Sequence, residues 1–361
     1  MARFVVYYLC MYSPRFTITS QINSAIAEIE RLRVAIEHSR ILPTKEVVLR
    51  RRAAIEATRS STGIEGNPLS EQEVELVLSG QTISASERFI TEVVNYKKAL
   101  SHIEKRSKDA TSLTAKDILT LHRMLMKDLL PKTKSGAFRK TPIYIVDIIG
   151  GKDIVRYQGP EPDTMMGLVD DFLGWLREET HDLHPLLVAG ILHYEFVSIH
   201  PFSDGNGRIT RLLTLVYLYQ HGYAFRKVFV PESYYFADTK RYYQALGQAS
   251  DYAHQHAADM TPWLSYFIEG LRAVVNDVSE KITRASWSGS QRGVLTLSEE
   301  DYRIIDFIAA VGTTMVNEIV SAVKVPKRTL QRRLSRLVRA GILMRTGRGP
   351  STQYKLKNNR S

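Results

Sequence analysis

The chain has little cysteine and no long hydrophobic run. Among its 361 residues the only cysteine is Cys10, so an intramolecular disulfide and a multi-cysteine zinc site are both excluded. A single cysteine also suits a reducing cytoplasm. No stretch approaches the roughly 20 apolar residues that a membrane-spanning helix needs. We therefore expect a soluble, cytoplasmic protein with no membrane contact.

The N-terminal residues imitate a targeting signal without completing one. Arg3 precedes an apolar run over residues 4–11, which is short and lacks a small-residue cleavage pattern. We predict a strand or an upstream extension here rather than a signal peptide.

Acidic residues are absent from residues 321–361. This segment carries four Lys and eight Arg, whereas the whole chain has a net charge of +11. The preceding residues are therefore close to neutral, and the basic character is local. Such a one-sided segment is either a disordered tail or a surface for nucleic acid.

Periodicity favours a folded basic domain. Apolar spacing predicts helices over residues 297–310, 315–323 and 327–340, followed by a hairpin of residues 342–346 and 352–356. Three helices and a basic hairpin resemble a winged helix-turn-helix, whose third helix enters the major groove of DNA. The predicted DNA contacts are Arg328, Thr329, Arg332, Arg333 and Arg336 on that helix and Arg348 on the wing. A winged helix that binds protein is the alternative.

The pattern of most of the remaining chain predicts helix. Apolar residues recur at spacings of three and four over residues 22–38, 45–59, 71–78, 86–104, 115–129, 165–178 and 261–278. The exception is a pair of β-branched segments, 143–149 and 153–158, which Gly150-Gly151 joins into a predicted β-hairpin. The expected fold class is mainly α with one hairpin, plus the small C-terminal domain.

The most informative stretch is His200-Pro201-Phe202-Ser203-Asp204-Gly205-Asn206-Gly207-Arg208-Ile209-Thr210-Arg211. Helical patterns on both sides make it a loop that leads into a helix. Gly205 and Gly207 free the backbone to approach a ligand, and the first amides of the following helix have no intrahelical partners. This geometry predicts a cradle for an anion.

The side chains around this cradle indicate transfer of a nucleotidyl or phosphoryl group. Arg208 and Arg211 are three residues apart and project from one helix face, where they would hold successive phosphates. Asp204 offers the hard oxygen that a phosphate-bound Mg²⁺ prefers. His200 titrates near neutral pH and is suited to take the proton from an attacking hydroxyl.

The ordered set resembles the signature HPFx(D/E)GNGRxxR of the Fic family, and every fixed position is present. The resemblance implies a protein adenylyltransferase that moves AMP from ATP to a hydroxyl side chain of a target protein. It assigns the general base to His200 and the Mg²⁺ ligand to Asp204. The residues implied to hold the phosphates of ATP are Gly205, Asn206, Gly207, Arg208 and Arg211.

A second element lies far upstream. Ser61 and Glu65 are four residues apart, in the last turn of a predicted helix that Gly66-Asn67-Pro68 ends. They resemble the family's inhibitory pattern (S/T)xxxE(G/N). The resemblance implies that Glu65 pairs with Arg211 where the γ-phosphate belongs, so that the chain is largely self-inhibited. Glu65 is also a candidate base for the reverse, hydrolytic reaction.

Two further predictions concern substrates. The resemblance makes the hairpin of residues 143–158 a flap that holds a target protein by adding one of its segments as a strand. An ordinary surface hairpin is the alternative. Tyr242 and Tyr243 lie in an aromatic cluster after the motif, where adenine would stack, although core packing is the commoner role of such residues.

These elements divide the chain into an N-terminal helical region with the inhibitory helix (1–110), a Fic catalytic core (111–280), a linker (281–295) and a winged helix-turn-helix (296–361). Related bacterial proteins pair a Fic domain with such a module. The competing function is a DNA-binding transcriptional regulator in which the Fic domain is secondary, against which the complete catalytic set argues. Another nucleotide or phosphate donor, the identity of the acceptor (Ser, Thr or Tyr) and a homodimer stay open.

Overall fold

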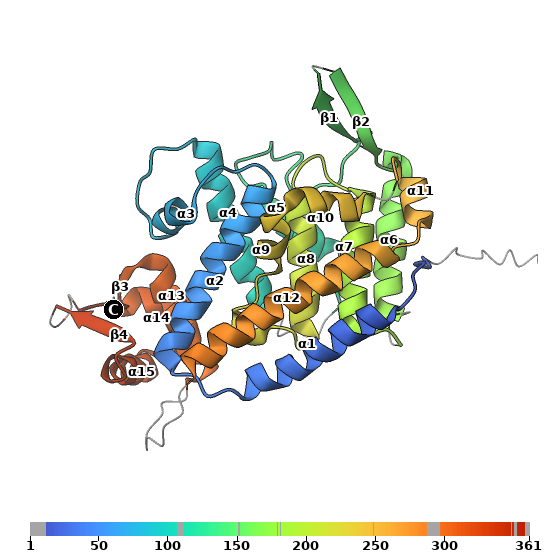
Figure 1. The fold of residues 1–361 in the computed structure, drawn as a ribbon. Helices are drawn as coiled ribbons and strands as arrows, with labels where there is room; N and C mark the ends of the chain where they lie inside the picture. The colour runs from blue at the N-terminus through green and yellow to red at the C-terminus, as the bar shows by residue number, and fades with distance from the viewer. Residues whose placement is uncertain are drawn as a thin grey trace, which may run out of the picture.

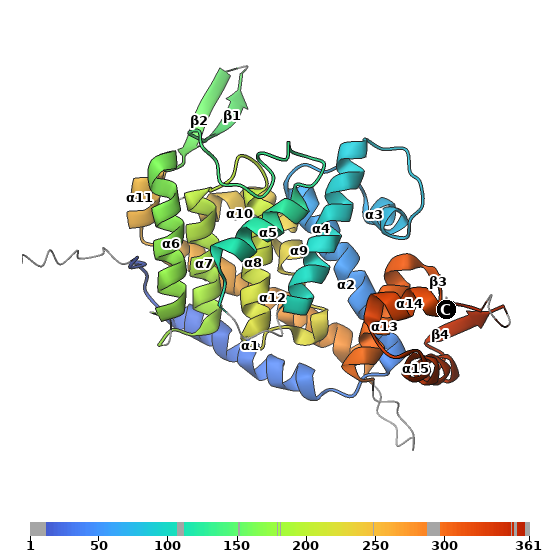
Figure 2. The same cartoon turned by 180° about the vertical axis from the view of Figure 1, so that it is seen from behind.

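The computed structural model describes residues 12–357, except 107–111, 151, 179, 181, 248, 287–296, 348, 350 and 351. Within these residues the chain is mainly helical, as predicted, with one protruding hairpin and a small C-terminal unit (Figure 1 and, from behind, Figure 2). Among the helices of this described part, none is both long and apolar enough to cross a bilayer.

The N-terminal part consists of α1 (Ser20–His38), α2 (Pro43–Ile64), α3 (Glu71–Leu78) and α4 (Glu87–Arg106). A capping box starts α3, because Ser70 and Glu73 each bond the backbone N–H of the other. Helix α2 begins with Pro43 and ends at Ile64, five residues beyond the apolar segment 45–59 and just before the predicted stop at Gly66. Ser61 therefore lies in its last turn, and Glu65 is the residue that caps it.

The central part consists of α5 (Ala115–Leu125), β1 (Tyr144–Ile149), β2 (Lys152–Gln158), α6 (Pro162–Glu178), α7 (Pro185–Ile199) and α8 (Asn206–Gln220). Helices α7 and α8 lie at the centre of the core, with almost every side chain buried. Helix α5 is shorter than the predicted segment 115–129. Its end is fixed by Asn95 of α4, whose amide donates to the carbonyls of Leu125 (3.1 Å) and Lys127 (2.7 Å).

After α8 the chain forms η1 (Phe225–Lys227), α9 (Pro231–Ala237), α10 (Thr239–Leu246), α11 (Tyr252–Ala257) and α12 (Thr261–Ala285). The sequence predicted only the last of these, because the others are too short to show helical periodicity. Helix α12 lies along α1 (Figure 1). It continues to Ala285 with Ile282 and Ala285 in the core, so residues 281–285 are helix and not the predicted linker.

The hairpin of β1 and β2 projects from the helical body (Figure 1). Its antiparallel register pairs Tyr144 with Gln158 and Ile149 with Lys152, with one irregularity between Ile145 and Val146. At its base, the N–H of Gln158 donates to the carbonyl of Ser250 (2.9 Å), which anchors β2 just before α11.

The C-terminal unit consists of α13 (Glu299–Val311), β3 (Thr313–Met315), α14 (Val316–Val323), α15 (Lys327–Arg339), β4 (Leu343–Thr346) and β5 (Gln353–Leu356). The three helices and the hairpin agree with the predicted pattern, but strand β3 was missed. The sheet order is β3-β5-β4, so β3 pairs with the second strand of the hairpin. The core of this unit also contains Val47 of α2.

Candidate active site

His200 stands at the end of α7, in the left-handed conformation with φ 51°. Its Nδ1 lies 3.0 Å from the carbonyl oxygen of Val197, which only accepts hydrogen bonds. Nδ1 therefore carries the proton, and Nε2 keeps a free lone pair. Burial lowers the pKa of His200, which keeps the ring neutral and able to accept a proton near neutral pH.

Two side chains fix the loop that follows. Phe202 is fully buried and stacks on the His122 ring at 3.7 Å between centroids, as expected of an anchor rather than a substrate contact. Asn206 bonds the backbone of Phe202 twice, accepting from its N–H (2.9 Å) and donating to its carbonyl (2.7 Å). The Asn206 side chain thus closes the loop instead of reaching toward a ligand. Only the backbone N–H of Asn206 stays available for the predicted phosphate contact.

His122, which the sequence analysis missed, holds the loop from the other side. Its Nε2 donates to the carbonyl of Asp204 (3.0 Å), and its Nδ1 accepts from the N–H of Gly136 (2.9 Å). Burial lowers the pKa of His122 to about 4, so the ring stays neutral and both bonds persist at physiological pH.

The N-terminus of α8 has the backbone geometry that an anion cradle requires. Gly205 precedes it with φ 82°, a left-handed conformation that suits glycine, and no side chain caps the helix. The first backbone N–H groups of α8 therefore lack intrahelical partners, and the helix dipole favours an anion beside them. A phosphate group would fit this position.

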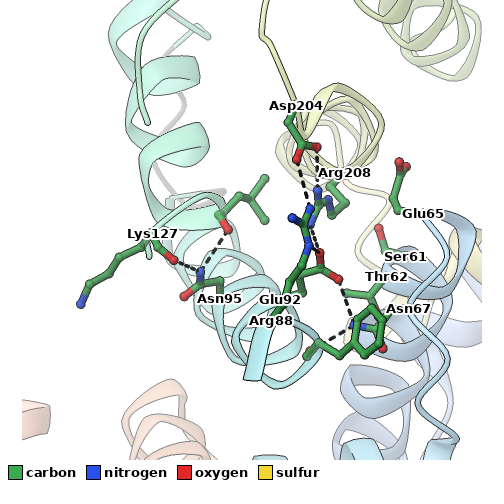
Figure 3. A network of polar contacts seen from close by, with 12 residues as sticks. Ser61, Thr62, Glu65, Asn67, Arg88, Glu92, Asn95, Lys127, Asp204 and Arg208 are labelled. Atoms are coloured by element: carbon green, nitrogen blue, oxygen red, sulfur yellow. Dashed lines mark hydrogen bonds and ion pairs between the residues drawn. The ribbon is translucent and has the colours of Figure 1, made fainter. Parts of the chain in front are cut away.

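Arg208 and Asp204 lie together at this helix end. Arg208 is 3% exposed and donates to Asp204 (3.1 Å), while its other terminal nitrogen lies 3.6 Å from Glu92 of α4. The second oxygen of Asp204 lies 3.5 Å from Arg88, and its side chain is 35% exposed. Figure 3 shows α2 and α4 approaching this pair from two sides. Arg88 and Glu92 carry no local sequence signal for this role.

Asp204 is suited to a magnesium ion that also binds the substrate. Among the described residues no cluster of three or more His, Cys, Asp or Glu could hold a metal. Mg²⁺ commonly takes one or two protein carboxylates and completes its shell with phosphate oxygens and water. The partly exposed carboxylate of Asp204, beside the anion cradle, fits that arrangement.

Arg211 contacts the end of α2, as the predicted pairing requires. Its side chain is 1% exposed and donates to Glu65 (2.8 Å). It also donates to both the hydroxyl and the carbonyl oxygen of Ser61, each at 2.9 Å. The structure thus brings Ser61, Glu65 and Arg211 together from positions about 150 residues apart.

The Glu65 carboxylate also covers the anion cradle. A Cβ atom built on Gly207 would collide with Glu65 and lie 3.1 Å from Arg211, so the carboxylate packs directly against the first turn of α8. Burial opposes ionisation of Glu65, but the charges of Arg211 and Arg208 outweigh it and lower the pKa of Glu65. An ionised carboxylate therefore stands where the cradle would hold a phosphate.

The turn after Glu65 is held in place by Asn67. Its amide nitrogen donates to Glu92 (3.0 Å) and to the carbonyl of Phe89 (3.1 Å), both on α4. Since Glu92 also faces Arg208, Asn67 links the end of α2 to the first arginine of the motif (Figure 3).

The predicted adenine pocket is wrong for Tyr242. This side chain is 1% exposed, and its hydroxyl lies 2.8 Å from Nε2 of His193 in the core. Tyr242 also stacks on Tyr235, so no base reaches its ring. Tyr243 is 49% exposed, and its hydroxyl donates to the carbonyl of Ile64 (3.4 Å) at the end of α2. Of the two, only Tyr243 stays available to a ligand.

Arg139 is a further residue that the sequence analysis left without a role. It is 6% exposed, and no carboxylate in the described part of the chain lies within ion-pair distance of it. It donates instead to the carbonyls of His200 (2.9 Å), Thr141 (3.0 Å) and Pro160 (2.6 Å). Arg139 therefore ties the base of the hairpin to the backbone of the predicted general base. Its backbone N–H also bonds the carbonyl of Pro201 (2.9 Å).

In the C-terminal unit, the structure corrects two of the predicted DNA contacts. Arg333 pairs with Asp301 (3.0 Å) and with Glu300, and Arg336 also pairs with Asp301, which is completely buried. Both arginines thus bind α13 within the unit. Arg328 and Arg332 are exposed and Thr329 is half-buried, while Arg348 lies outside the described residues.

Comparison with known proteins agrees with this geometry. A model of the Fic/DOC family matches residues 112–218. The chain is similar to protein adenylyltransferase Fic from Drosophila grimshawi, with 29% identity over 249 residues that cover 65% of this chain and 46% of that protein. The protein of the same name from Culex quinquefasciatus is 33% identical over 179 residues, which cover 47% of this chain and 33% of that protein. The chain thus spans less than half the length of these curated relatives.

Solved structures extend the likeness beyond residues 112–218. A Fic family protein from Desulfovibrio desulfuricans matches with a TM-score of 0.64 and 26% identity, over 97% of this chain and 99% of that chain. Fic-1 from C. elegans matches with a TM-score of 0.61 and 25% identity, over 73% and 74%. The fold and the site thus define a class of helical domain in which a loop that starts at a histidine leads into a helix N-terminus suited to an anion. Residues 112–218 of this chain match the model of the Fic/DOC family.

Proposed function

We propose that the chain is a protein adenylyltransferase that transfers AMP from ATP to a Ser, Thr or Tyr hydroxyl of a target protein. The observation that carries the proposal is the lone pair of His200 Nε2, fixed by the Nδ1 contact with Val197, beside an uncapped helix N-terminus. The names of the curated relatives support the same activity.

In the proposed reaction His200 Nε2 takes the proton of the target hydroxyl. The hydroxyl oxygen then forms a bond to the α-phosphorus of ATP, while the bond from that phosphorus to the bridging oxygen breaks and pyrophosphate leaves. The N-terminal amides of α8, with Arg208 and Arg211, hold the phosphates. Mg²⁺ held by Asp204 would neutralise phosphate charge.

Glu65 inhibits this reaction in the proposal. Its carboxylate occupies the cradle and bonds Arg211, so a triphosphate competes with an ion pair that is already formed. A triphosphate bound without Arg211 would be displaced from the productive position.

The hairpin of β1 and β2 is the proposed contact for the target protein. Its apolar side chains Tyr144, Val146 and Val155 are 50%, 46% and 53% exposed, which is unusual for residues that serve only folding. Backbone pairing along a free strand edge would hold an extended target segment regardless of its sequence, and Arg139 ties this hairpin to His200.

The position of the transferred label tests the proposal. The chain, Mg²⁺ and a mixture of candidate target proteins are incubated with ATP labelled at either the α- or the γ-phosphorus. We expect label on protein only from the α-position. Transfer of the γ-label would instead indicate phosphoryl transfer, the alternative donor chemistry. If a previously modified target loses its α-label and an unmodified target gains none, the chain catalyses the reverse reaction.

A second proposed function, DNA binding, concerns the C-terminal unit. Arg328 and Arg332 are exposed and four residues apart on α15, so they project from one helix face without acidic partners within the described residues. We propose that this face binds DNA and brings the enzyme to DNA or to a DNA-bound target. A transcriptional regulator without transferase activity would share this face.

A gel shift over a range of salt concentrations tests the DNA contact. We expect affinity to fall steeply with salt. Arg328→Ala with Arg332→Ala should reduce the salt slope by about 2, one unit for each phosphate group that the variant no longer binds. The charge-matched control replaces the exposed Lys116 and Lys132 of the Fic/DOC domain with Ala and should bind as the unaltered chain does. If the affinity for DNA changes neither with salt nor with the α15 substitutions, the DNA contact is excluded and the unit is expected to bind protein.

A further inference from the structure

A cleft of about 790 Å³ lies between the C-terminal unit and helices α2, α3 and α4. Its walls include the N-terminal half of α2, whereas Ser61 and Glu65 lie at the other end of that helix. Ile55 is the α2 residue lining the cleft that lies nearest to Glu65 in the sequence, and the ten residue steps between them span roughly 15 Å of helix. The cleft is therefore separate from the candidate active site, and its volume is within the range of small-molecule sites, about 300–1,000 Å³.

The lining of this cleft is strongly cationic. Eight Lys and Arg side chains face it, against three acidic ones. They come from both sides of the cleft, from the helical body and from the C-terminal unit. The six that matter here are Lys97, Lys98 and Lys105 of α4, Lys227 of η1, Arg303 of α13 and Lys324 at the end of α14.

The acidic side chains do not neutralise this charge. Glu75 pairs with Arg51 (3.0 Å) and Glu104 with Lys227 (3.4 Å). Burial raises the pKa of Asp306, the third acid, despite the cations near it. Within the described part of the chain, Lys98, Lys105, Arg303 and Lys324 form no ion pair. Like charges thus face one another across the cleft, an arrangement that costs free energy and that a bound anion would reverse.

The cleft also has an apolar wall. Val77, Val94 and Phe307 line it, and Val311 is 49% exposed at its side. A simple inorganic anion would leave this wall in contact with water. A ligand that joins an anionic group to a flat apolar body would use both kinds of surface.

We propose that this cleft binds a nucleoside polyphosphate, with the phosphates on the unpaired cations and the base against the apolar wall. A nucleic-acid strand fits less well, because Phe307 is the only aromatic residue among the described residues lining the cleft. Proteins that bind single strands stack successive bases on several aromatic side chains. The exposed arginines of α15 do not line the cleft, so the site is distinct from the proposed DNA contact.

Helix α2 connects the cleft to the inhibitory contact. Val47 packs in the core of the C-terminal unit, the Tyr302 hydroxyl donates to Glu46 (2.8 Å), and the Arg50 guanidinium lies 3.9 Å from the Tyr302 ring centroid. The C-terminal unit thus packs against α2, and Glu65 is the C-cap residue of the same helix. A nucleotide in the cleft would therefore contact the element that carries the inhibitory residue.

Calorimetric titration of the full chain with ATP, GTP and inorganic tripolyphosphate tests the proposal. Lys98→Ala combined with Arg303→Ala removes one unpaired cation from each wall and should raise the Kd of the nucleotides at least about tenfold. Lys116→Ala combined with Lys132→Ala, which removes two exposed lysines elsewhere, should leave the Kd unchanged. Phe307→Ala should weaken nucleotides but not tripolyphosphate.

A second variant distinguishes nucleotide binding in the candidate active site from nucleotide binding in the cleft. Glu65→Gly opens the anion cradle, so binding there should tighten in this variant, whereas binding in the cleft should be unchanged. Since these are direct binding measurements, they stand even if no AMP is transferred. Unaltered nucleotide affinity in the Lys98→Ala, Arg303→Ala variant would overturn the proposal. So would tripolyphosphate binding as tightly as nucleotides, or a single-stranded oligonucleotide binding more tightly than either.

Discussion

Replacing Glu65 with glycine is expected to raise the incorporation of AMP label from ATP on the order of 10- to 100-fold, the factor that corresponds to a charged hydrogen bond of about 1.5–3 kcal/mol. The reason is geometric. Glu65 bonds Arg211 at 2.8 Å and packs against Gly207, so it blocks both the arginine and the helix end that the phosphates need. Its removal frees both at once.

The same substitution should make the folded chain less stable. Arg211 is 1% exposed, and without Glu65 it loses the carboxylate that compensates its charge, although its contacts with Ser61 remain. Leaving a buried cation unpaired costs free energy. We therefore expect higher activity together with a lower midpoint of thermal unfolding, measured by circular dichroism, and partial recovery of that midpoint when ATP and Mg²⁺ are added.

Glu65→Gln is the matched control. It preserves the volume and one acceptor oxygen but removes the charge, so its activity should lie between those of the unaltered chain and Glu65→Gly. Equal rates for all three proteins would show that the Glu65–Arg211 pair does not restrain the enzyme.

The motif loop could be predicted from sequence because its conformation and its candidate groups are local. His200, Asp204, Gly205 and Arg208 lie within nine consecutive residues, and the conformation of the loop follows from its own glycines and from the helices that flank it. The Glu65–Arg211 pairing could be predicted from the sequence for a different reason. It depends on a helix ending at a particular residue, which Gly66 and Pro68 mark in the sequence.

The supporting residues could not be predicted, because their roles depend on contacts between distant segments. Arg139 and His122 gain theirs only when the hairpin base and α5 pack on the motif loop. Tyr242 failed as a ligand contact since aromatic residues at helical spacing give the same pattern in a core and in a pocket. Likewise, nothing in the local pattern around Arg333 of α15 reveals that Asp301 of α13 binds it.

The largest loss is expected from His200→Ala, made in the Glu65→Gly background so that the starting activity is high. General-base catalysis contributes about 10²- to 10⁴-fold, and the label transferred per minute should fall by that factor. The affinity for ATP should change little, because the His200 ring contacts the carbonyl of Val197 rather than the phosphate-binding groups. If the rate of label transfer and the affinity for ATP fell by the same factor, the substitution would have damaged the loop and not merely removed a base.

The pH dependence separates a base from a merely structural histidine. Burial lowers the pKa of His200, whereas the negative charge of Glu65 raises it. The acidic limb of kcat/KM should therefore lie below the usual histidine pKa of about 6.5 in the unaltered chain, and lower still in Glu65→Gly, because that variant lacks the charge that favours the imidazolium form. The limb should vanish in the Glu65→Gly, His200→Ala double variant, whose residual rate has no imidazole at this position to titrate. An acidic limb that persists unchanged there would belong to another group and would remove His200 from the role of base.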